Sequence, residues 1–379
     1  MEDSQNNSNI LKRIDIYENK EEIPPLQTER KNFIQNKMMK FYKLISNKDD
    51  KENQILFMSD NKGIVYMYEF MEDNKPSKIL NLNSICNDSK YILVDIIKSS
   101  KYHYYISLNL NPCINIFKFK NSSQNDNKEI EVLQHINLKT NNKSLKYYKI
   151  YECNIRNKDY LILLSENKIE LWLNNNNNNN KDIVNYERIY SLLYENSENE
   201  NEESKDNANK ISNIYKINEE NLVLFEKNKL EFIYLKISEI KGKKVIIEIE
   251  NKIKINGIKP QFENINSLFI DKNYIFLGLC DSLILVSVPY GEIIQTYKFG
   301  KVLLMKKINE EKDTIIFAET NLKEYFFIKF KYEEGIGFKE IKRVKYDYWV
   351  YKFDIIQKVL NEDIIAVYDI KGFITLLKC

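Results

Sequence analysis

Apolar and polar positions repeat in the same order seven times along this chain. In each copy an apolar run ends in a polar turn, and a second apolar or alternating run follows at once. The copies occupy residues 55–70, 104–120, 160–173, 221–235, 274–288, 314–330 and 363–378. Two such runs around a turn are typical of a β-hairpin, and hairpins that recur at intervals of roughly 40–60 residues indicate a radial array of β-sheets.

Further strands extend each hairpin toward four strands. They are expected at residues 77–82, 91–97, 130–138, 148–155, 183–193, 211–217, 245–255, 265–270, 292–299, 302–308, 338–346 and 350–356. The hairpin runs ILFM, LILL, LVLF, IIFA and IIAV are continuously apolar, as a strand covered on both faces requires, whereas EVLQHINL alternates as an outer strand does. The sequence therefore predicts an all-β fold: a seven-bladed β-propeller of four-stranded blades, forming a single domain over residues 1–379.

The last repeat supplies only three strands before the sequence ends at Cys379. An unpaired sheet edge would remain there, and such an edge invites association with other chains. Residues 10–17 (ILKRIDIY) alternate as a strand does and have no hairpin partner nearby. We therefore expect this N-terminal strand to complete the last blade and close the ring, so that its deletion destabilises the whole protein.

Three segments depart from the repeat. Residues 18–40 connect the closing strand to the first hairpin, and the stretch TERKNFIQNKMM within them favours a short helix. Residues 174–181 consist almost entirely of asparagine, and residues 195–209 are strongly acidic with almost no apolar content. Such compositions bury too little apolar surface to fold, so both are expected to be disordered low-complexity insertions. The acidic one is either a solvated insertion or a docking tail.

The composition favours an intracellular protein without a strong overall electric field. Lysine and arginine number 57 against 55 acidic residues, so no net charge of the whole chain attracts nucleic acid or membranes. Five scattered cysteines without a CxxC pair indicate neither a disulfide framework nor a zinc site, which suggests a reducing compartment, cytoplasmic or nuclear. The sequence shows no signal-peptide pattern and no apolar stretch of membrane-spanning length.

The second strand of several hairpins resembles the WD40-repeat superfamily, in which this strand ends in a Trp-Asp pair. KIELWL places Trp172 at the tryptophan position, GIVYMYE places Tyr68 there with Glu69 after it, and CINIFK places Phe117 there. No copy has the complete Trp-Asp or the Gly-His pair, so the chain resembles a degenerate member of the superfamily. The resemblance implies the propeller architecture and carries over no functional residue.

No pattern in the sequence indicates catalysis, a cofactor or a metal. The chain has two histidines, His103 and His135, in strand patterns, and it has no phosphate-binding glycine motif. Pairs such as Asp281-Ser282 recur in the hairpin turns, where they favour turn hydrogen bonds over a ring of acidic groups. Cys280, in the same turn, is interpreted as a small packed residue, with a reactive thiol as the alternative.

Two clusters mix basic and aromatic residues, at residues 30–43 and 339–349. Lysines beside exposed aromatic rings can bind RNA through phosphate contacts and stacking, whereas alternating lysines also protect the edge of an outer strand. The edge interpretation is preferred, and contact with a partner or with RNA is its alternative. The candidate contact residues are Lys339, Lys342, Arg343, Lys345 and Tyr348. Trp349 and Tyr351 alternate into the next strand, so at least one is expected in the core.

The preferred function is a non-catalytic, WD40-like scaffold for protein–protein interactions within a multi-subunit intracellular complex. The alternative is an RNA-associated accessory subunit, such as the non-catalytic partner of a tRNA methyltransferase, which the last two repeats loosely resemble. The Asp-Arg-Asp…Arg-x-Ser stretch of that family is missing here. We expect protein partners, no cofactor, no membrane insertion and no obligate homo-oligomer. A propeller enzyme is the third hypothesis, and the missing acid–base groups count against it.

Overall fold

The computed structural model describes the strands of this chain and some of their connections. The described residues are 10–15, 41–46, 54–59, 65–70, 78–80, 93–99, 104–109, 113–121, 128–138, 147–155, 157–165, 168–175, 184–193, 211–218, 220–240, 244–258, 265–309, 312–321, 324–333, 337–359, 362–369 and 373–379. The chain divides into two compact units. Unit 1 comprises residues 1–38, 230–232 and 253–379, and unit 2 comprises residues 39–229 and 233–252.

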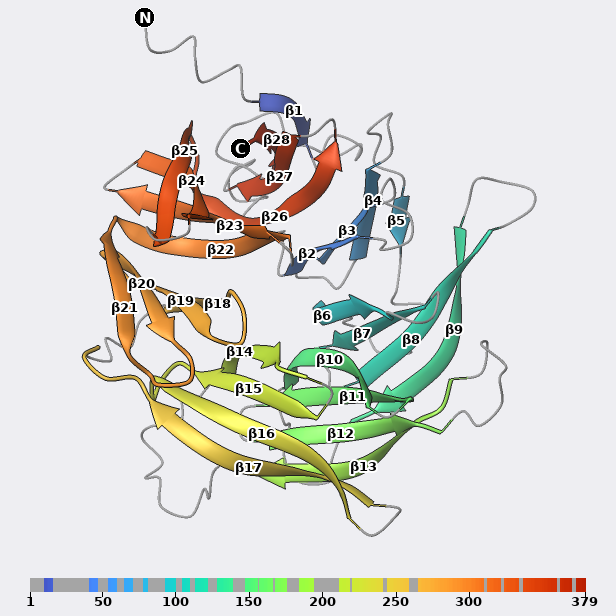
Figure 1. The fold of residues 1–379 in the computed structure, drawn as a ribbon. Coiled ribbons are helices and arrows are strands. Elements are labelled where there is room, and N and C mark those ends of the chain that lie inside the picture. Colours follow the sequence, from blue (N-terminus) through green and yellow to red (C-terminus); the bar gives the residue numbers. More distant parts are fainter. Residues whose placement is uncertain are drawn as a thin grey trace, which may run out of the picture. The chain divides into compact units, whose positions relative to one another are not determined.

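Unit 2 holds four sheets of four strands, except residues 231–232 and 253–254 of the fourth sheet, which belong to unit 1 (Figure 1). In pairing order the strands are β2 (Phe41–Ser46), β3 (Gln54–Ser59), β4 (Val65–Phe70) and β5 (Lys78–Leu80); β6 (Leu93–Lys98), β7 (Tyr105–Asn109), β8 (Cys113–Asn121) and β9 (Lys128–Asn137); β10 (Tyr147–Ile155), β11 (Lys158–Ser165), β12 (Lys168–Asn174) and β13 (Tyr186–Leu193); and β14 (Ile211–Lys216), β15 (Asn221–Glu226), β16 (Glu231–Ile240) and β17 (Lys244–Lys254).

Unit 1 holds three further sheets of four strands. In pairing order their strands are β18 (Asn266–Phe269), β19 (Tyr274–Gly278), β20 (Ser282–Ser287) and β21 (Ile293–Lys298); β22 (Lys301–Asn309), β23 (Lys312–Asn321), β24 (Glu324–Glu333) and β25 (Gly337–Tyr346); and β26 (Val350–Val359), β27 (Glu362–Asp369), β28 (Phe373–Lys378) and β1 (Ile10–Asp15). The described residues therefore form seven four-stranded sheets, and the predicted four-stranded organisation is confirmed.

The N-terminal strand β1 pairs antiparallel with β28, as the sequence analysis expects of it. Five residue pairs join the two strands, from Ile10 with Leu377 to Asp15 with Phe373. The rest of the predicted closing segment, residues 16–17, and the connector at 18–40 with its expected helix lie outside the described residues. This pairing therefore joins the first described strand in the sequence to the last one.

The strand β2 was not predicted. Its short alternation FYKLIS overlaps the end of the basic cluster at residues 30–43, whose lysines and aromatic residues obscure the strand pattern. β2 pairs with β3 from Phe41 with Ser59 to Ser46 with Gln54 and so supplies the missing first strand of its sheet. Six consecutive residues of β2 pair with β3, so the neighbouring strand defines β2 although the sequence pattern of β2 is short.

The predicted start of the asparagine insertion, residue 174, is wrong by two residues. Asn174 is the last residue of β12, and the backbone N–H of Asn175 donates to the carbonyl of Asn185 at 2.8 Å. The Asn175 side chain also donates to Glu187 at 2.7 Å. These asparagines extend the β12–β13 pairing because their backbone groups find partners there. The remainder of both predicted insertions, 176–181 and 195–209, lies outside the described residues.

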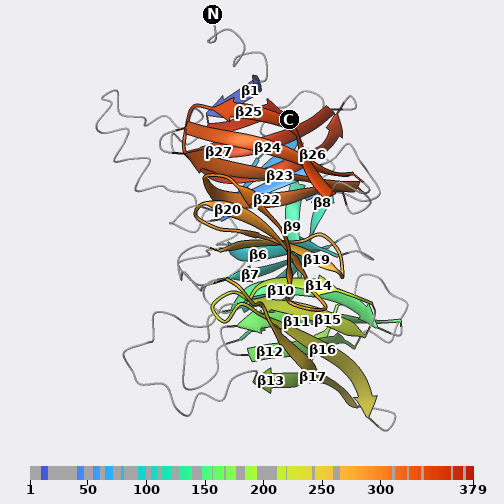
Figure 2. The ribbon, with the colours of Figure 1, turned by 60° about the vertical axis from the view of Figure 1, so that its left-hand side comes forward.

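Apolar clusters lie between consecutive sheets within each unit. In β11, Leu164 belongs to a cluster shared with β14–β17, while its neighbour Leu163 belongs to a cluster shared with β6–β9. In β23, Phe317 and Ile316 divide in the same way between the sheets on either side. Figures 1 and 2 both show the β10–β13 sheet beside the β14–β17 sheet. The continuous apolar runs are therefore strands with two buried faces, as predicted.

Four outer strands share an irregularity that their sequences did not lead us to predict. β9, β13, β21 and β25 each contain a β-bulge, where one residue has no partner on the neighbouring strand. This residue is aliphatic every time: Leu133, Ile189, Ile294 and Ile341. A bulge twists an edge strand and interrupts its hydrogen-bonding pattern, so it protects these edges from pairing with other chains.

Candidate functional site

β25 carries four of the five candidate contact residues and forms the outer edge of its sheet. This edge position agrees with the preferred interpretation of its lysines. The bulge at Ile341 reverses the alternation of side chains, so Lys339 and Lys342 lie on one face of the strand, whereas Arg343 and Lys345 lie on the other. The four basic side chains therefore do not form one continuous patch.

Arg343 is held by groups of its own sheet. Its guanidinium donates two hydrogen bonds of 3.0 Å to the Glu340 carboxylate and one of 3.2 Å to Glu319, whose side chain is almost fully buried. It also lies over the ring of Phe326, 5.3 Å from the ring centre. The hydrogen bonds to Glu340 raise the pKa of Arg343 above its ordinary value. Arg343 thus neutralises a buried carboxylate, which leaves it little capacity to contact RNA.

The three lysines of the candidate set differ in their surroundings. Lys345 forms an ion pair of 2.9 Å with Glu324, and Lys339 forms a looser one of 3.6 Å with Glu333. Lys342 is exposed on the edge strand. Exposed ion pairs of this kind contribute little to stability and exchange readily with other partners. These lysines are therefore available at the surface, but on two faces of one strand.

The aromatic end of the candidate set is only partly available. Tyr348 packs against the apolar cluster between the β22–β25 and β26–β28 sheets. The prediction that Trp349 or Tyr351 lies in the core is wrong, because Trp349 is 37% exposed and Tyr351 is half-buried. Val350 and Phe353 occupy the buried positions instead. Trp349 precedes β26, so the alternation that we extended through it begins one residue later.

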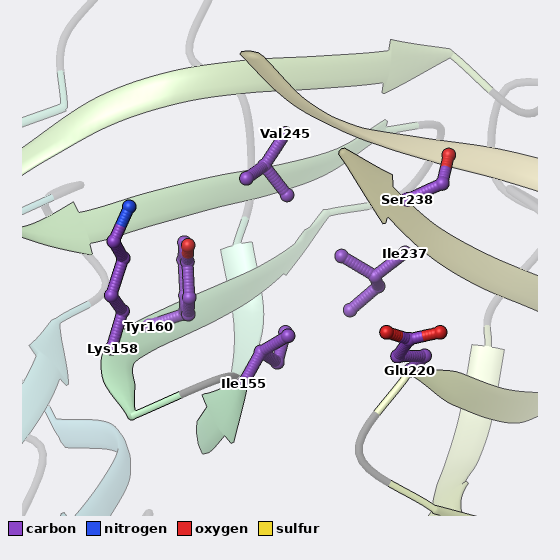
Figure 3. Close-up of a pocket in the computed structure, with 7 residues that line it drawn as sticks. All are labelled: Ile155, Lys158, Tyr160, Glu220, Ile237, Ser238 and Val245. Carbon is purple, nitrogen blue, oxygen red and sulfur yellow. The ribbon is translucent and has the colours of Figure 1, made fainter. Parts of the chain in front are cut away.

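A small pocket of about 220 Å³ opens in unit 2 between the β10–β13 and β14–β17 sheets (Figure 3). It is lined by Ile155, Lys158, Tyr160, Glu220, Ile237, Ser238 and Val245. Figure 3 shows Lys158 and Tyr160 on one side and Glu220 and Ser238 on the other, around the three aliphatic residues. Its volume lies below the roughly 300–1,000 Å³ of typical ligand pockets, so it gives no reason to infer a cofactor.

Two of the buried carboxylates, Glu170 and Asp369, are bonded to neighbouring side chains. Glu170 accepts hydrogen bonds of 3.2 Å from the indole of Trp172 and from Arg188. Asp369 accepts one of 2.9 Å from the hydroxyl of Tyr346. Buried charges are expensive unless they are paired in this way, so these carboxylates are explained by their structural partners. Sequence reasoning did not single them out, because Arg188 and Tyr346 come from other strands than the carboxylates that they bond.

The remaining sequence candidates are placed as follows. His135 is exposed, and its Nδ1 lies 2.6 Å from the side-chain oxygen of Asn115. The hydroxyl of Ser165 donates to the carbonyl of Lys168 at 3.1 Å, which is the predicted turn chemistry. Cys280 is exposed, so its interpretation as a packed residue is wrong.

The described part of the chain holds neither a group of side chains suited to a metal ion nor a membrane-spanning helix. No three histidine, cysteine, aspartate or glutamate side chains come together there in a group that could hold a metal ion. Within the same residues, no helix has the length and hydrophobicity needed to cross a lipid bilayer.

One concentration of exposed apolar side chains was missed by sequence reasoning. Among the residues whose burial is described, eight large apolar side chains are exposed, and seven of them belong to unit 1. Six lie on the β18–β21 and β22–β25 sheets: Tyr274, Tyr290, Ile293, Ile294, Tyr332 and Ile341, with exposures of 37%, 71%, 37%, 53%, 42% and 45%. We call these six residues the apolar surface.

The sequence carried a weak signal for this surface. In EIIQTYKF two isoleucines are adjacent. Strict alternation of apolar and polar residues along an outer strand would place a polar residue next to an apolar one. The structure explains the pair, because Ile293 opposes Val286 while Ile294 is the unpaired residue of the bulge. Two adjacent aliphatic residues in an otherwise alternating outer strand therefore indicate a bulge. Strand propensity or hydropathy taken alone does not indicate it.

Comparisons with known proteins identify the fold. No family model matches the sequence, and no curated protein matches it either. The structure is similar to that of Sqt1 from Saccharomyces cerevisiae, with 11% identity, 86% of this chain and 81% of that chain covered, and a TM-score of 0.53. The WD40 domain of SCAP from fission yeast has 8% identity, 90% and 88% coverage and a TM-score of 0.48.

These likenesses concern the fold alone. The β-propeller domain of Cps50 (Swd1) from Myceliophteria thermophila also has 7% identity, 74% and 80% coverage and a TM-score of 0.45. The chain is an all-β propeller with four-stranded blades, as its sequence predicted. A shared fold does not define a function, so the function has to be argued from the surface.

Proposed function

We propose that this protein is a non-catalytic scaffold for protein–protein interactions, a subunit of a larger intracellular complex. We further propose that its seven sheets are the blades of one ring, which β1 closes by pairing with β28. The observation that carries the scaffold function is the apolar surface, six large side chains left exposed on two successive sheets. Contiguous apolar patches rimmed by polar residues are typical of protein-binding sites.

The fold itself gives no reason for these side chains to be exposed. At the same bulge position, Leu133 in β9 and Ile189 in β13 are half-buried against apolar clusters. Ile294 and Ile341 are 53% and 45% exposed. An exposed aliphatic residue forgoes the roughly 25 cal/mol per Å² that burial would contribute. A partner that covers the surface would recover this free energy, which supports the proposed role.

The non-catalytic part of the proposal is supported by how the polar groups are used. Glu170, Glu319 and Asp369 are buried, and each is bonded to neighbouring side chains. A general acid or base needs free access to a substrate proton, and these groups lack it. In the part of the chain that the structure describes, Cys113, Cys153, Cys280 and Cys379 form no disulfide, which suits a reducing intracellular compartment.

RNA binding through β25 is the second proposal and has less support. Arg343 is engaged by Glu340 and Glu319, and the bulge divides the lysines between two faces. Lys339, Lys342 and Lys345 remain at the surface and could contact phosphates singly. A phosphate-binding groove would instead need several cations along one path.

Affinity purification of the tagged full-length protein from its own cells tests the proposal. Half of each extract is treated with nuclease, and bound proteins are quantified by mass spectrometry. We expect a stoichiometric set of proteins that survives the nuclease. Recovery of RNA together with a methyltransferase, lost on nuclease treatment, would favour the RNA alternative. Recovery of the tagged protein alone would contradict the scaffold function.

A further inference from the structure

The apolar surface extends over two sheets of unit 1 that contact each other. Gly291, with φ of +68°, lies so close to the Lys254 carbonyl that an added Cβ would come within 2.5 Å of it. The N–H of Asn256 donates to the carbonyl of Gly291 at 3.2 Å. A Cβ added at Gly257 would also lie 3.4 Å from the Ile293 side chain, so the segment 254–257 meets the chain around Gly291 and Ile293 at one edge of the β18–β21 sheet.

The same surface continues onto the next sheet. The hydroxyl of Tyr297 in β21 donates to the carbonyl of Phe338 in β25 at 2.9 Å. The ring of Tyr332 packs edge-to-face on Phe338 with 5.4 Å between ring centres. Gly337, with φ of +89°, is in close contact with Gln295, the residue after Ile294. These contacts hold β21, which carries Ile293 and Ile294, directly against β25, which carries Ile341.

The charges around the apolar surface are mainly positive. Four exposed lysines lie beside it in sequence or in contact: Lys254, Lys272, Lys331 and Lys342. The carboxylates nearby are largely engaged. Asp271 accepts backbone N–H groups of its own turn at 2.7 and 2.9 Å, and Glu333 and Glu340 are paired with Lys339 and Arg343. Glu292 is the exposed exception.

We propose that this surface binds a peptide segment of a partner protein in which apolar or aromatic residues stand among acidic ones. The proposal deepens the scaffold function and rests on it. Apolar residues of the segment would cover Tyr290 and Ile294, and its carboxylates would face the lysines. The acidic segment 195–209 of this chain does not fit the description, because its one apolar side chain, the methyl group of Ala208, is too small to cover the surface.

A random library of 16-residue peptides, displayed and selected against the full-length protein, tests the partner chemistry. We expect enriched peptides to carry net negative charge together with leucine, isoleucine, phenylalanine or tryptophan. Their affinity, measured by fluorescence anisotropy, should weaken about tenfold or more for Ile294→Asp and for Tyr290→Ser. Val132→Asp is the matched control, since Val132 is 38% exposed on the outer strand β9 of unit 2.

The results that would overturn the proposal are distinct. Failure of any peptide to be enriched, enrichment without acidic residues, or equal binding by Ile294→Asp would each refute it. Competition by a synthetic 195–209 peptide would refute the need for apolar residues. Sedimentation with phosphatidylserine vesicles, lost in Ile294→Asp, would assign the surface to a membrane instead. Thermal melting of each variant confirms folding, and stoichiometric partners recovered by Ile294→Asp would leave the scaffold function standing while refuting this surface.

Discussion

The two units of the protein use the same structural device with opposite results. In unit 2 the unpaired aliphatic residues of the outer-strand bulges, Leu133 and Ile189, pack against the clusters between sheets. In unit 1 the equivalent residues, Ile294 and Ile341, are about half exposed. The bulge protects a sheet edge in both units, so edge protection does not require exposure. The bulge is therefore a feature of the fold, whereas the exposure of Ile294 and Ile341 is a separate feature that the proposed binding surface uses.

The neighbours of these residues explain the difference. Ile189 packs beside Tyr190 and Leu192 against a cluster that contains aliphatic residues of both adjacent sheets. Along β21 the burial pattern leaves only Gln295 and Tyr297 partly covered, and both side chains lie on the face toward β25. The same bulge therefore buries or exposes its aliphatic residue depending on what packs over it.

Removal of the N-terminal strand should lower the free energy of unfolding more than any other change proposed here. Deletion of residues 1–17 leaves the edge of β28 unpaired and removes five backbone pairings, which at about 1 kcal/mol each lowers the free energy of unfolding on the order of 5 kcal/mol. Hydrogen exchange should show lost protection first in β26–β28. An unchanged melting temperature would contradict the closing role. Equal loss in all seven sheets would show that the units are one cooperative body.

Arg343→Ala should have the next largest effect, confined to unit 1. Glu319 would lose its cationic partner while its side chain stays 4% exposed, so we expect destabilisation of about 2 kcal/mol, reduced from the fully buried case because Arg343 is 38% exposed. Urea denaturation measures the change. Lys345→Ala is the matched control, since its ion pair is exposed and should contribute less than about 0.5 kcal/mol. Equal effects would contradict the structural role of Arg343.

The bulge residues test the comparison directly. Ile189→Ser should destabilise the protein by about 1–2 kcal/mol, because this half-buried side chain packs on a core cluster. Ile294→Ser should change stability by less than about 0.5 kcal/mol, because half of its side chain is already in water. Thermal and urea denaturation give both values. A larger cost at Ile294 than at Ile189 would show that the exposed residue is structural.

Thiol labelling leaves stability unchanged and compares the opening of the two units through a buried cysteine in each. Burial raises the pKa of Cys153 in unit 2 and of Cys379 in unit 1 to about 12, so neither forms the reactive thiolate near neutral pH. Exposed Cys280 should react with a maleimide first. Mass spectrometry of digests follows each site, and the two buried thiols report the opening of their own units. Labelling of Cys153 as fast as Cys280 would contradict its burial.

The same thiols predict how stability depends on pH. In the unfolded chain a cysteine ionises near its ordinary pKa of 9.0, whereas Cys153 and Cys379 hold their protons to about pH 12 in the folded chain. The folded state therefore binds more protons in this window, and the free energy of unfolding should fall as pH rises from about 9 toward 12. Urea midpoints measured across this range check the sign. A rise in stability would contradict it.

The basic strand shows where prediction from sequence ended. KEIKRVK correctly indicated a polar outer strand, and β25 is the edge of its sheet. The pattern did not show that Arg343 is engaged by Glu319, because that carboxylate lies on β23, 24 residues away in sequence. It also did not show that the bulge at Ile341 divides the lysines. Bulge and ion pair both depend on the register between strands, which no single strand encodes.

The sequence by itself determined the strands other than β2, their grouping in fours and the partner of the N-terminal strand. These features follow from local alternation and from the rule that a sheet edge has to be covered, so each can be read from one segment at a time. Only the tertiary structure decided which face each outer strand shows and which aliphatic residues stay in water. A bulge shifts every side chain beyond it to the other face, and the packing of the next sheet then determines whether that face is buried.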